Sequence, residues 1–533
     1  MRAIFQESAR FGGPFLFYNT TGMGKPHLPR KPRPWLLAAL VIYGLVLALT
    51  LLHHEPWRDE LQAWLIARDA ENLQELWHNT RYEGHPILWH FLLFLAARLW
   101  PNPAAMQILH FLVAFTVAAL LLFCAPFPFP LRVGLTFSYF FLYEYAVISR
   151  NYALTALFIF AFSCLQKGPP LPAAFLAAAA SHSSPMGLLA FPALAVWLFT
   201  QKRDGRFLAL GVALPVAAAA VWSCWPPPDS GYARPLFLAW EPIRAQYVLR
   251  GLAGALLPVV PPQLQFWNIN WLYPMPRGQQ VGEALLTAAA AGTLLAAGWL
   301  LWSACGRAKR TFFGWLFGLA TCLIFFYAVF PGTVRHHGIF LLLTVAAFWI
   351  APPLSGKKAW RLSLPVGLGL WSALWACSTD WKNAFSANRA TALWLSSSPV
   401  ASLPLVGFPD WAASGVAGWL PGKKLFYPAS GDWGTFIRWT KAREQKETAL
   451  SPLQAKAVAK RKLGGRPFLF LSNQPLTREQ VFPCDLVFHS GPVIVPDEAH
   501  WLYLCQGRGP EEAVLPFDDD GRSSGGSSFG QGE

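Results

Sequence analysis

Charged residues are scarce in this chain: Asp, Glu, Lys and Arg make up 13% of its 533 residues, whereas 54% of the chain is apolar. A typical soluble domain carries roughly 25% charged residues. Apolar runs long enough to cross a bilayer recur from Trp35 to Cys377, and none follows Ser378. We therefore expect a polytopic α-helical membrane domain over residues 34–377, followed by a soluble domain over residues 378–510.

Cysteine spacing typical of a metal site is also absent from the sequence. Six of the eight cysteines lie within or at the ends of apolar runs, where they are expected to act as small packing residues. Cys484 and Cys505 lie in the predicted soluble domain. They can form a disulfide if that domain is in an oxidising compartment, and the sequence alone does not decide whether they do. The first apolar run has no convincing signal-peptide cleavage site, which predicts that it is retained as a span.

The net charge of +15 does not form one continuous basic face, so a nucleic-acid partner is not expected. Lys and Arg instead form small clusters between apolar runs, a pattern typical of cytoplasmic loops. The clusters are residues 25–33, Arg132, Lys167, residues 202–206, 307–310 and 357–361. This rule predicts a cytoplasmic basic N-terminus over residues 1–33 and an exterior C-terminal domain.

About eleven spans satisfy that rule if the short apolar run over residues 86–100 is a re-entrant or interfacial helix. The expected spans are residues 35–52, 104–124, 131–148, 151–166, 170–182, 186–200, 207–225, 282–303, 312–330, 338–352 and 362–377. Two larger outer loops follow from this topology, over residues 53–103 and 226–281.

The soluble region after the last span combines a predicted helix over residues 381–397 with short apolar runs and basic helical stretches over residues 441–462. The short runs are residues 424–427, 435–439, 467–471 and 486–489. This alternation predicts a small α/β domain. The tail over residues 511–533 contains a Gly- and Ser-rich stretch and is expected to be disordered.

Polar residues that are difficult to explain as solvated surface gather on the predicted outer face. An acidic pair opens an amphipathic helix in the first outer loop, and carboxylates at a bilayer surface are costly to keep unless they have a function. The candidate site residues are Asp59, Glu60, His85, Glu144, Arg150, Arg335 and His336. The carboxylates among them can accept a proton from an attacking hydroxyl. They can also bind a divalent cation, although the pattern does not require one. The Arg and His side chains can bind a phosphate.

Structural roles for the same residues stay open at this point. The acidic pair could stabilise a helix N-terminus, which is worth about 0.3–1 kcal/mol. Glu144 could be a buried structural carboxylate, and Arg150 could anchor a span at the interface. His85 could open a helix before Pro86.

At these residues the sequence resembles the GT-C superfamily of membrane glycosyltransferases, in the branch that contains protein O-mannosyltransferases and lipid A aminoarabinose transferases. The matching features are Arg58-Asp59-Glu60, the Glu-Gly-His-Pro stretch over residues 83–86, and Ser149-Arg150 at the next outer hairpin. The motifs fall within roughly residues 35–200, and the remainder matches by architecture only.

The resemblance implies a protein of the cytoplasmic (inner) membrane of a bacterium. It also implies transfer of a sugar from a polyprenyl-phosphate donor to a glycan, lipid or protein acceptor outside that membrane. It implies Asp59 as the general base, with Glu60 as helper or alternative, and suggests Arg150, Arg335 and His336 for the donor phosphate. Glu144 precedes Ser149-Arg150 instead of following it, which departs from the family pattern. The alternative is a transporter or flippase of a lipid-linked saccharide, which predicts polar residues at mid-membrane and inverted repeats. Neither feature is clear in the sequence.

Overall fold

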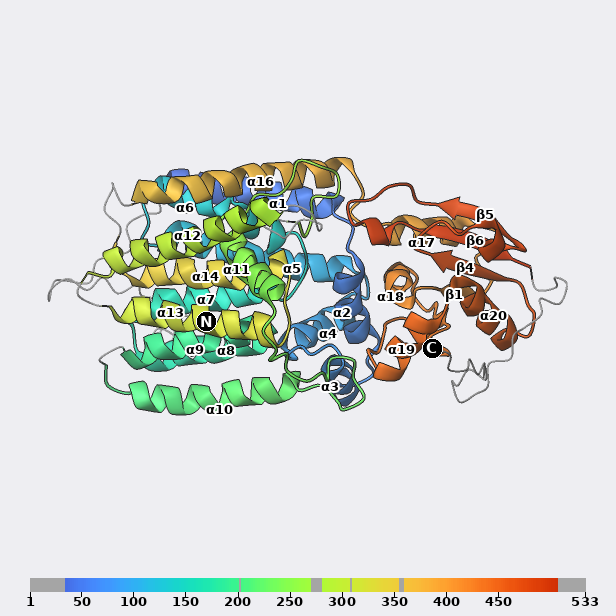
Figure 1. Cartoon of the computed structure of the whole chain (residues 1–533), viewed down its shortest axis with the longest axis horizontal. Helices are drawn as coiled ribbons and strands as arrows, with labels where there is room; N and C mark the ends of the chain where they lie inside the picture. Colours follow the sequence, from blue (N-terminus) through green and yellow to red (C-terminus); the bar gives the residue numbers. More distant parts are fainter. Residues whose placement is uncertain (1–33, 201–202, 270–279, 307–308, 354–358, 507–533) are drawn as a thin grey trace, which may run out of the picture.

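The computed structural model describes residues 34–200, 203–269, 280–306, 309–353 and 359–506. A helical bundle forms one end of the molecule and a smaller α/β domain forms the other, with three short helices between them (Figure 1). The predicted N-terminal segment over residues 1–33 and the tail over residues 511–533 lie outside the described residues.

Within the described residues, six helices are long and apolar enough to cross a membrane. They are α1 (Pro34–His53), α5 (Ala104–Ala119, continued by the π-helical turn η2, Leu120–Cys124), α10 (Arg206–Cys224), α12 (Gln280–Ala304), α13 (Arg310–Ala328) and α16 (Ser363–Lys382, preceded by η5, Trp360–Leu362). α1 buries Tyr43 and Leu47 against its neighbours and exposes Leu45 and Leu52. Exposed apolar side chains on such helices are those expected to face lipid.

The eleven full-length spans expected from the sequence are not observed. Four of the expected segments form shorter apolar helices in the bundle, and they pack against one another. These are α7 (Tyr152–Cys164, followed by η4, Leu165–Lys167), α8 (Pro170–Ser183), α9 (Pro185–Thr200) and α14 (Val334–Ile350).

The fifth shorter segment, expected over residues 131–148, is broken into α6 (Phe129–Thr136) and a π-helical turn η3 (Phe140–Glu144). At the break, the Ser138 backbone N–H and hydroxyl both donate to the Leu135 carbonyl, at 3.0 Å and 2.8 Å.

Three short helices of the loop over residues 53–103 lie between the bundle and the α/β domain: α2 (Arg58–Asp69), α3 (Leu73–Arg81) and α4 (Leu88–Leu99). α4 is the short helix expected over residues 86–100. The loop over residues 226–281 contains α11 (Pro242–Leu256), a helix that was not expected from the sequence. The Arg250 guanidinium on α11 is buried and pairs with the Glu283 carboxylate on α12.

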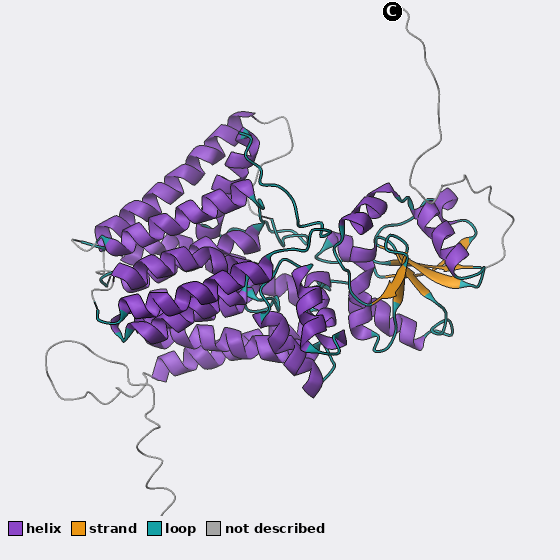
Figure 2. Ribbon diagram, turned by 90° about the horizontal axis from the view of Figure 1, so that it is seen from below, coloured by secondary structure: helices purple, strands orange, loops and turns teal. Residues whose placement is uncertain are grey.

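The α/β domain contains one six-stranded sheet in the order β3-β2-β1-β4-β6-β5 (Figure 2). The strands are β1 (Leu405–Gly407), β2 (Leu425–Tyr427), β3 (Asp432–Gly434), β4 (Phe468–Ser472), β5 (Cys484–His489) and β6 (Trp501–Cys505). The flanking helices are α17 (Asn388–Ser397), α18 (Asp410–Ala413), η6 (Ser414–Trp419), α19 (Lys441–Ala449), α20 (Pro452–Lys462), α21 (Arg478–Val481) and η7 (Pro496–Glu498). β1 pairs in parallel with β2 and β4, and the other pairs are antiparallel.

The two faces of this sheet explain how the domain is attached. Side chains alternate along β4, so Phe468 and Phe470 pack with α20, while Leu469 and Leu471 belong to a core shared with α2. The α/β domain therefore shares a hydrophobic core with the helix that begins with Arg58-Asp59-Glu60.

Three details of the domain differ from or complete the sequence-based expectation. Residues 381–397 form the end of α16 and a separate α17, not one helix. Residues 435–439 lie outside the sheet and contact α2 and α3. Cys484 and Cys505 face each other across β5 and β6 and form a disulfide.

Candidate active site

The first turn of α2 is fixed by the Glu60 carboxylate, which is fully buried. It accepts a hydrogen bond from the Trp57 backbone N–H at 3.1 Å, in the manner of a capping box. Its other oxygen accepts from the Ser149 backbone N–H. Glu60 therefore ties the start of α2 to the hairpin that carries Arg150.

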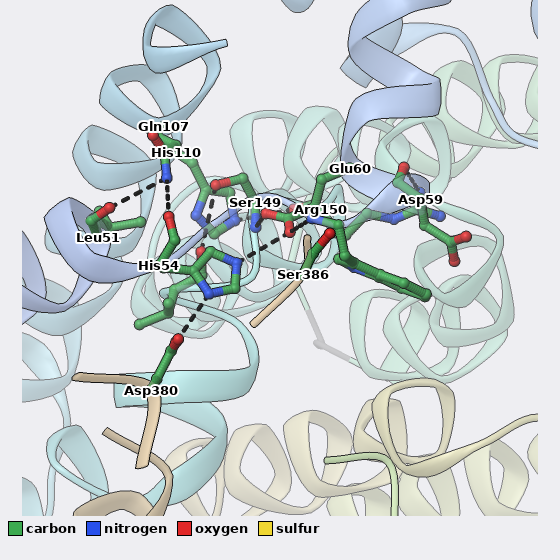
Figure 3. A network of polar contacts seen from close by, with 12 residues as sticks. Leu51, His54, Asp59, Glu60, Gln107, His110, Ser149, Arg150, Asp380 and Ser386 are labelled. Carbon is green, nitrogen blue, oxygen red and sulfur yellow. Dashed lines mark hydrogen bonds and ion pairs between the residues drawn. The ribbon is translucent and has the colours of Figure 1, made fainter. Parts of the chain in front are cut away.

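His54 holds the same carboxylate from the end of α1 (Figure 3). Its Nε2 lies 3.1 Å from Glu60 and its Nδ1 lies 2.9 Å from the Asp380 carboxylate near the end of α16. Burial acts to lower the pKa of His54, but Asp380 and Glu60 outweigh it and raise the pKa to about 10. The imidazolium thus links two buried carboxylates, and the Tyr143 hydroxyl donates to Asp380 at 3.0 Å.

Asp59 precedes Glu60 and has a different environment, because its carboxylate is 28% exposed. One oxygen lies 3.0 Å from the Arg335 guanidinium on α14, and the other lies 4.0 Å from Arg58. Burial acts to raise the pKa of Asp59, but the positive charges of Arg335, Arg150 and Arg58 outweigh it and lower the pKa below its ordinary value. Asp59 is therefore ionised at neutral pH.

Arg150 and Arg335 bring cationic groups to Asp59 from two distant parts of the chain. Arg150 donates to the Asp59 backbone carbonyl, and its own carbonyl contacts a ring nitrogen of His110 on α5 at 3.1 Å. The Tyr145 hydroxyl donates to the Arg335 carbonyl at 2.6 Å and holds the start of α14.

The Arg335 guanidinium lies over two indole rings, 4.9 Å from the centre of Trp57 and 5.3 Å from that of Trp267. Its Nε and Nη1 are buried and have no hydrogen-bond acceptor among the described residues. Arg335 therefore has donor capacity that the residues around it do not use.

The Glu83-Gly84-His85 turn forms another side of the site. Gly84 has φ +64°, a left-handed conformation that glycine adopts readily, and His85 Nδ1 then lies 2.8 Å from the Glu83 carbonyl. Burial and the charge of Arg150 lower the pKa of His85 to about 3, so the ring is neutral. With Nδ1–H donating to that carbonyl, His85 Nε2 is the acceptor nitrogen.

The Glu83 side chain, which was not among the predicted site residues, lies close to the same charges. Its carboxylate accepts from Gln62 Nε2 at 2.8 Å. Burial raises the pKa of Glu83 to about 7, against the lowering effect of Gln62 and Arg150, and the nearby charge of Asp59 adds to the rise. The sequence signal for Glu83 was its place in the same short turn as His85.

Two predicted site residues have structural contacts instead of an open position. Glu144 is 1% exposed, and one of its oxygens accepts from the Tyr139 hydroxyl at 2.7 Å and from Trp267 Nε1 at 3.2 Å. His336 caps α14, because its Nδ1 accepts from the Thr333 backbone N–H at 3.1 Å. The structure thus brings Asp59, His85, Arg150 and Arg335 together and uses Glu60, Glu144 and His336 in the surrounding framework.

The α/β domain reaches this site through Arg58. The Arg58 guanidinium lies 2.8 Å from Asp497 and 3.4 Å from Glu498, and it stacks over Trp411 at 4.5 Å. Glu498 is itself buried and accepts from Ser386 at 2.7 Å. These contacts fix Arg58 beside Asp59.

No group of three or more His, Cys, Asp or Glu side chains in the described part of the chain is arranged to hold a metal ion. Comparison of the chain with protein-family models, with curated proteins and with solved structures gives no match. The chemistry of the site is therefore that of its own groups. These are an ionised carboxylate, two guanidinium groups and a neutral imidazole at one end of an apolar bundle.

Proposed function

We propose that the chain is a GT-C-type membrane glycosyltransferase that transfers a sugar from a polyprenyl-phosphate donor to an acceptor outside a bacterial cytoplasmic membrane. The observation that carries the proposal is the ion pair between the partly exposed Asp59 carboxylate and Arg335, with Arg150 donating to the Asp59 backbone carbonyl, at the end of the bundle next to the α/β domain. A carboxylate beside two phosphate-binding cations suits attack by a hydroxyl on a sugar phosphate.

In the proposed reaction, an acceptor hydroxyl attacks the anomeric carbon of the donor sugar. A new C–O bond forms to the acceptor as the bond between the anomeric carbon and the phosphate oxygen breaks. The polyprenyl phosphate leaves with the electron pair of that bond, and the hydroxyl proton passes to Asp59. The step balances without an oxidant, a reductant or a metal ion.

Arg335 and Arg150 are the proposed ligands of the donor phosphate. Without substrate, Arg335 pairs with Asp59 and leaves two nitrogens without acceptors among the described residues. A phosphate at Arg335 competes for that guanidinium and adds negative charge near Asp59. Both effects raise the proton affinity of Asp59, so donor binding makes the carboxylate a better base.

The neighbouring groups have distinct proposed roles. Nε2 of the neutral His85 ring can accept a hydrogen bond from a substrate hydroxyl. Glu60 has its oxygens engaged by Trp57, Ser149 and His54, so we assign it to positioning Asp59. The acceptor can be a glycan, a lipid or a protein, since the site chemistry requires only a nucleophilic hydroxyl.

The test is release of polyprenyl phosphate by the full chain in lipid nanodiscs, with a panel of polyprenyl-phosphate sugars and of hydroxyl acceptors. Turnover with at least one donor is expected. Failure to turn over any donor, combined with movement of labelled lipid-linked saccharide across proteoliposome membranes, would contradict the transferase and identify a flippase.

A further inference from the structure

The end of the connection between α10 and α11, together with the first turn of α11, exposes large apolar side chains. Leu236 is 60% exposed, Leu238 79%, Trp240 77% and Ile243 62%. A contiguous group of this kind on one short segment indicates a binding partner, since isolated exposed apolar residues are common but clusters are not. We refer to residues 236–243 as the apolar segment.

The backbone of the apolar segment is held in place by the end of α13. Phe237 N–H donates to the Ala328 carbonyl at 2.8 Å, and Glu241 N–H donates to the Tyr327 hydroxyl at 2.7 Å. The Trp240 ring stacks on the Tyr327 ring at 6.1 Å. The apolar side chains are therefore presented by a fixed framework.

The partner of the apolar segment is indicated by its neighbours. α13, to which it is bound, is one of the six candidate membrane spans, and Ile324 near the end of that helix is 68% exposed. Val329 and Phe330, directly after α13, are 53% and 41% exposed. The apolar segment thus continues a lipid-facing surface, and a hydrocarbon chain fits it better than a soluble protein.

Both flanks of the apolar segment lead to the candidate active site. On one side, the Gly231 N–H donates to the Trp439 carbonyl at 2.9 Å, and the Gln62 amide that donates to Glu83 also donates to the nearby Ile437 carbonyl at 2.6 Å. On the other side, the Tyr247 hydroxyl on α11 donates to the Gly332 carbonyl at 2.9 Å, three residues before Arg335. An anionic head group at Arg335 and a hydrocarbon chain on the apolar segment therefore belong to neighbouring sites.

We propose that the apolar segment binds the polyprenyl chain of the donor whose phosphate lies at Arg335 and Arg150. This inference rests on the proposed function and adds the place where the lipid chain binds. It implies that the protein selects donors by chain length, because a short chain leaves the segment only partly covered. Each apolar group removed from water contributes to binding in proportion to its buried area.

The experiment compares the same sugar on undecaprenyl phosphate and on geranyl phosphate, which has two isoprene units. The variant is the double substitution Leu238→Gln and Trp240→Gln, and the control is Leu295→Gln, which changes a 73% exposed leucine on α12. In the variant, KM for the undecaprenyl donor is expected to rise about tenfold. kcat and KM for the geranyl donor are expected to change less than twofold.

Unchanged chain-length selectivity in a folded double variant would overturn the inference. Absence of turnover by wild type with either donor is a failure of the proposed function instead, and the segment is then tested by binding alone. A diazirine-bearing undecaprenyl phosphate is expected to crosslink residues 236–243 in preference to a diazirine-bearing phospholipid. Equal crosslinking by both probes would show general bilayer contact and would overturn the inference.

Discussion

The Asp59 carboxylate lies 3.0 Å from the Arg335 guanidinium, although 276 positions separate the two residues in the chain. In the proposed mechanism, a donor phosphate competes with the Asp59 carboxylate for the Arg335 guanidinium. The pair therefore connects the binding of the phosphate to the basicity of Asp59.

Replacing Arg335 by Gln is expected to weaken donor binding more than it slows the chemical step. A charge-assisted hydrogen bond contributes about 1.5–3 kcal/mol, so KM for the donor is expected to rise about 10- to 150-fold. Arg335→Lys keeps the charge and loses the planar fork, and is expected to recover part of the loss. Steady-state kinetics in nanodiscs measures KM for the donor in both variants. The control is Arg361→Gln, which changes an exposed arginine that precedes α16. An unchanged KM in Arg335→Gln would exclude the assigned phosphate contact.

His54→Gln is expected to destabilise the fold in a pH-dependent way. The pKa of His54 is raised to about 10, above its ordinary 6.5, so its contribution to stability is complete below pH 6.5. That contribution is lost as the pH rises through about 10. Removing one partner of a buried ion pair costs about 3–5 kcal/mol. Thermal unfolding at pH 6.5 and pH 10 is therefore expected to show a large deficit that shrinks at the higher pH.

The neighbouring substitution His53→Gln is the control, because His53 is exposed and its ring contacts the Leu49 carbonyl and the Trp381 ring instead of a carboxylate. A deficit in His54→Gln that stays constant between the two pH values would show that the loss comes from packing and not from the charge.

Glu83→Gln is expected to stabilise the protein at alkaline pH. Burial raises the pKa of Glu83 to about 7 from its ordinary 4.5, so folding takes up a proton between these values. The contribution of the protonated Glu83 carboxyl to the free energy of unfolding is complete below pH 4.5. It is lost as the pH rises through about 7. The unfolding temperature of Glu83→Gln should exceed that of wild type at pH 8.5 and match it near pH 4.5. Glu71→Gln, at an exposed position, should match wild type at both. A variant with a lower unfolding temperature at pH 8.5 would refute this account.

The sequence located most helices because apolar composition alone determines where a chain can be buried or face lipid. The span expected over residues 282–303 is α12, and that over residues 170–182 is α8. α11 was missed because it carries the charged Arg250, which is buried in a pair with Glu283 on another helix. Such a partner becomes visible only in three dimensions.

The sequence also grouped Asp59 with Arg150 and Arg335, through the rule that assigns loops to one side of the membrane. It could not separate Asp59 from Glu60. Successive residues of a helix point about 100° apart, so one carboxylate faces the buried His54 and the other faces the arginines. His54 and Asp380 gave no sequence signal for their pairing, because 326 positions separate them.

The disulfide between Cys484 and Cys505 provides a test of orientation. If the α/β domain lies outside the cytoplasm, both thiols should resist a membrane-impermeant maleimide in intact spheroplasts until a reductant is added. Labelling is then expected in wild type and absent from the double substitution Cys484→Ser and Cys505→Ser. Labelling of these positions only after the membrane is permeabilised would place the domain on the opposite side.

The most direct measurement of the central claim is polyprenyl phosphate release by wild type and by Asp59→Asn, with Glu71→Gln as a carboxylate-neutralising control in the same loop between α1 and α5. A general base contributes typically about 10²- to 10⁴-fold to the rate. The account predicts a loss of kcat in this range for folded Asp59→Asn, with donor binding at least as tight as in wild type because the carboxylate charge that competes for Arg335 is removed, and full activity for Glu71→Gln. Turnover by folded Asp59→Asn within a few-fold of wild type would contradict Asp59 as the base and, with it, the mechanism proposed for this site.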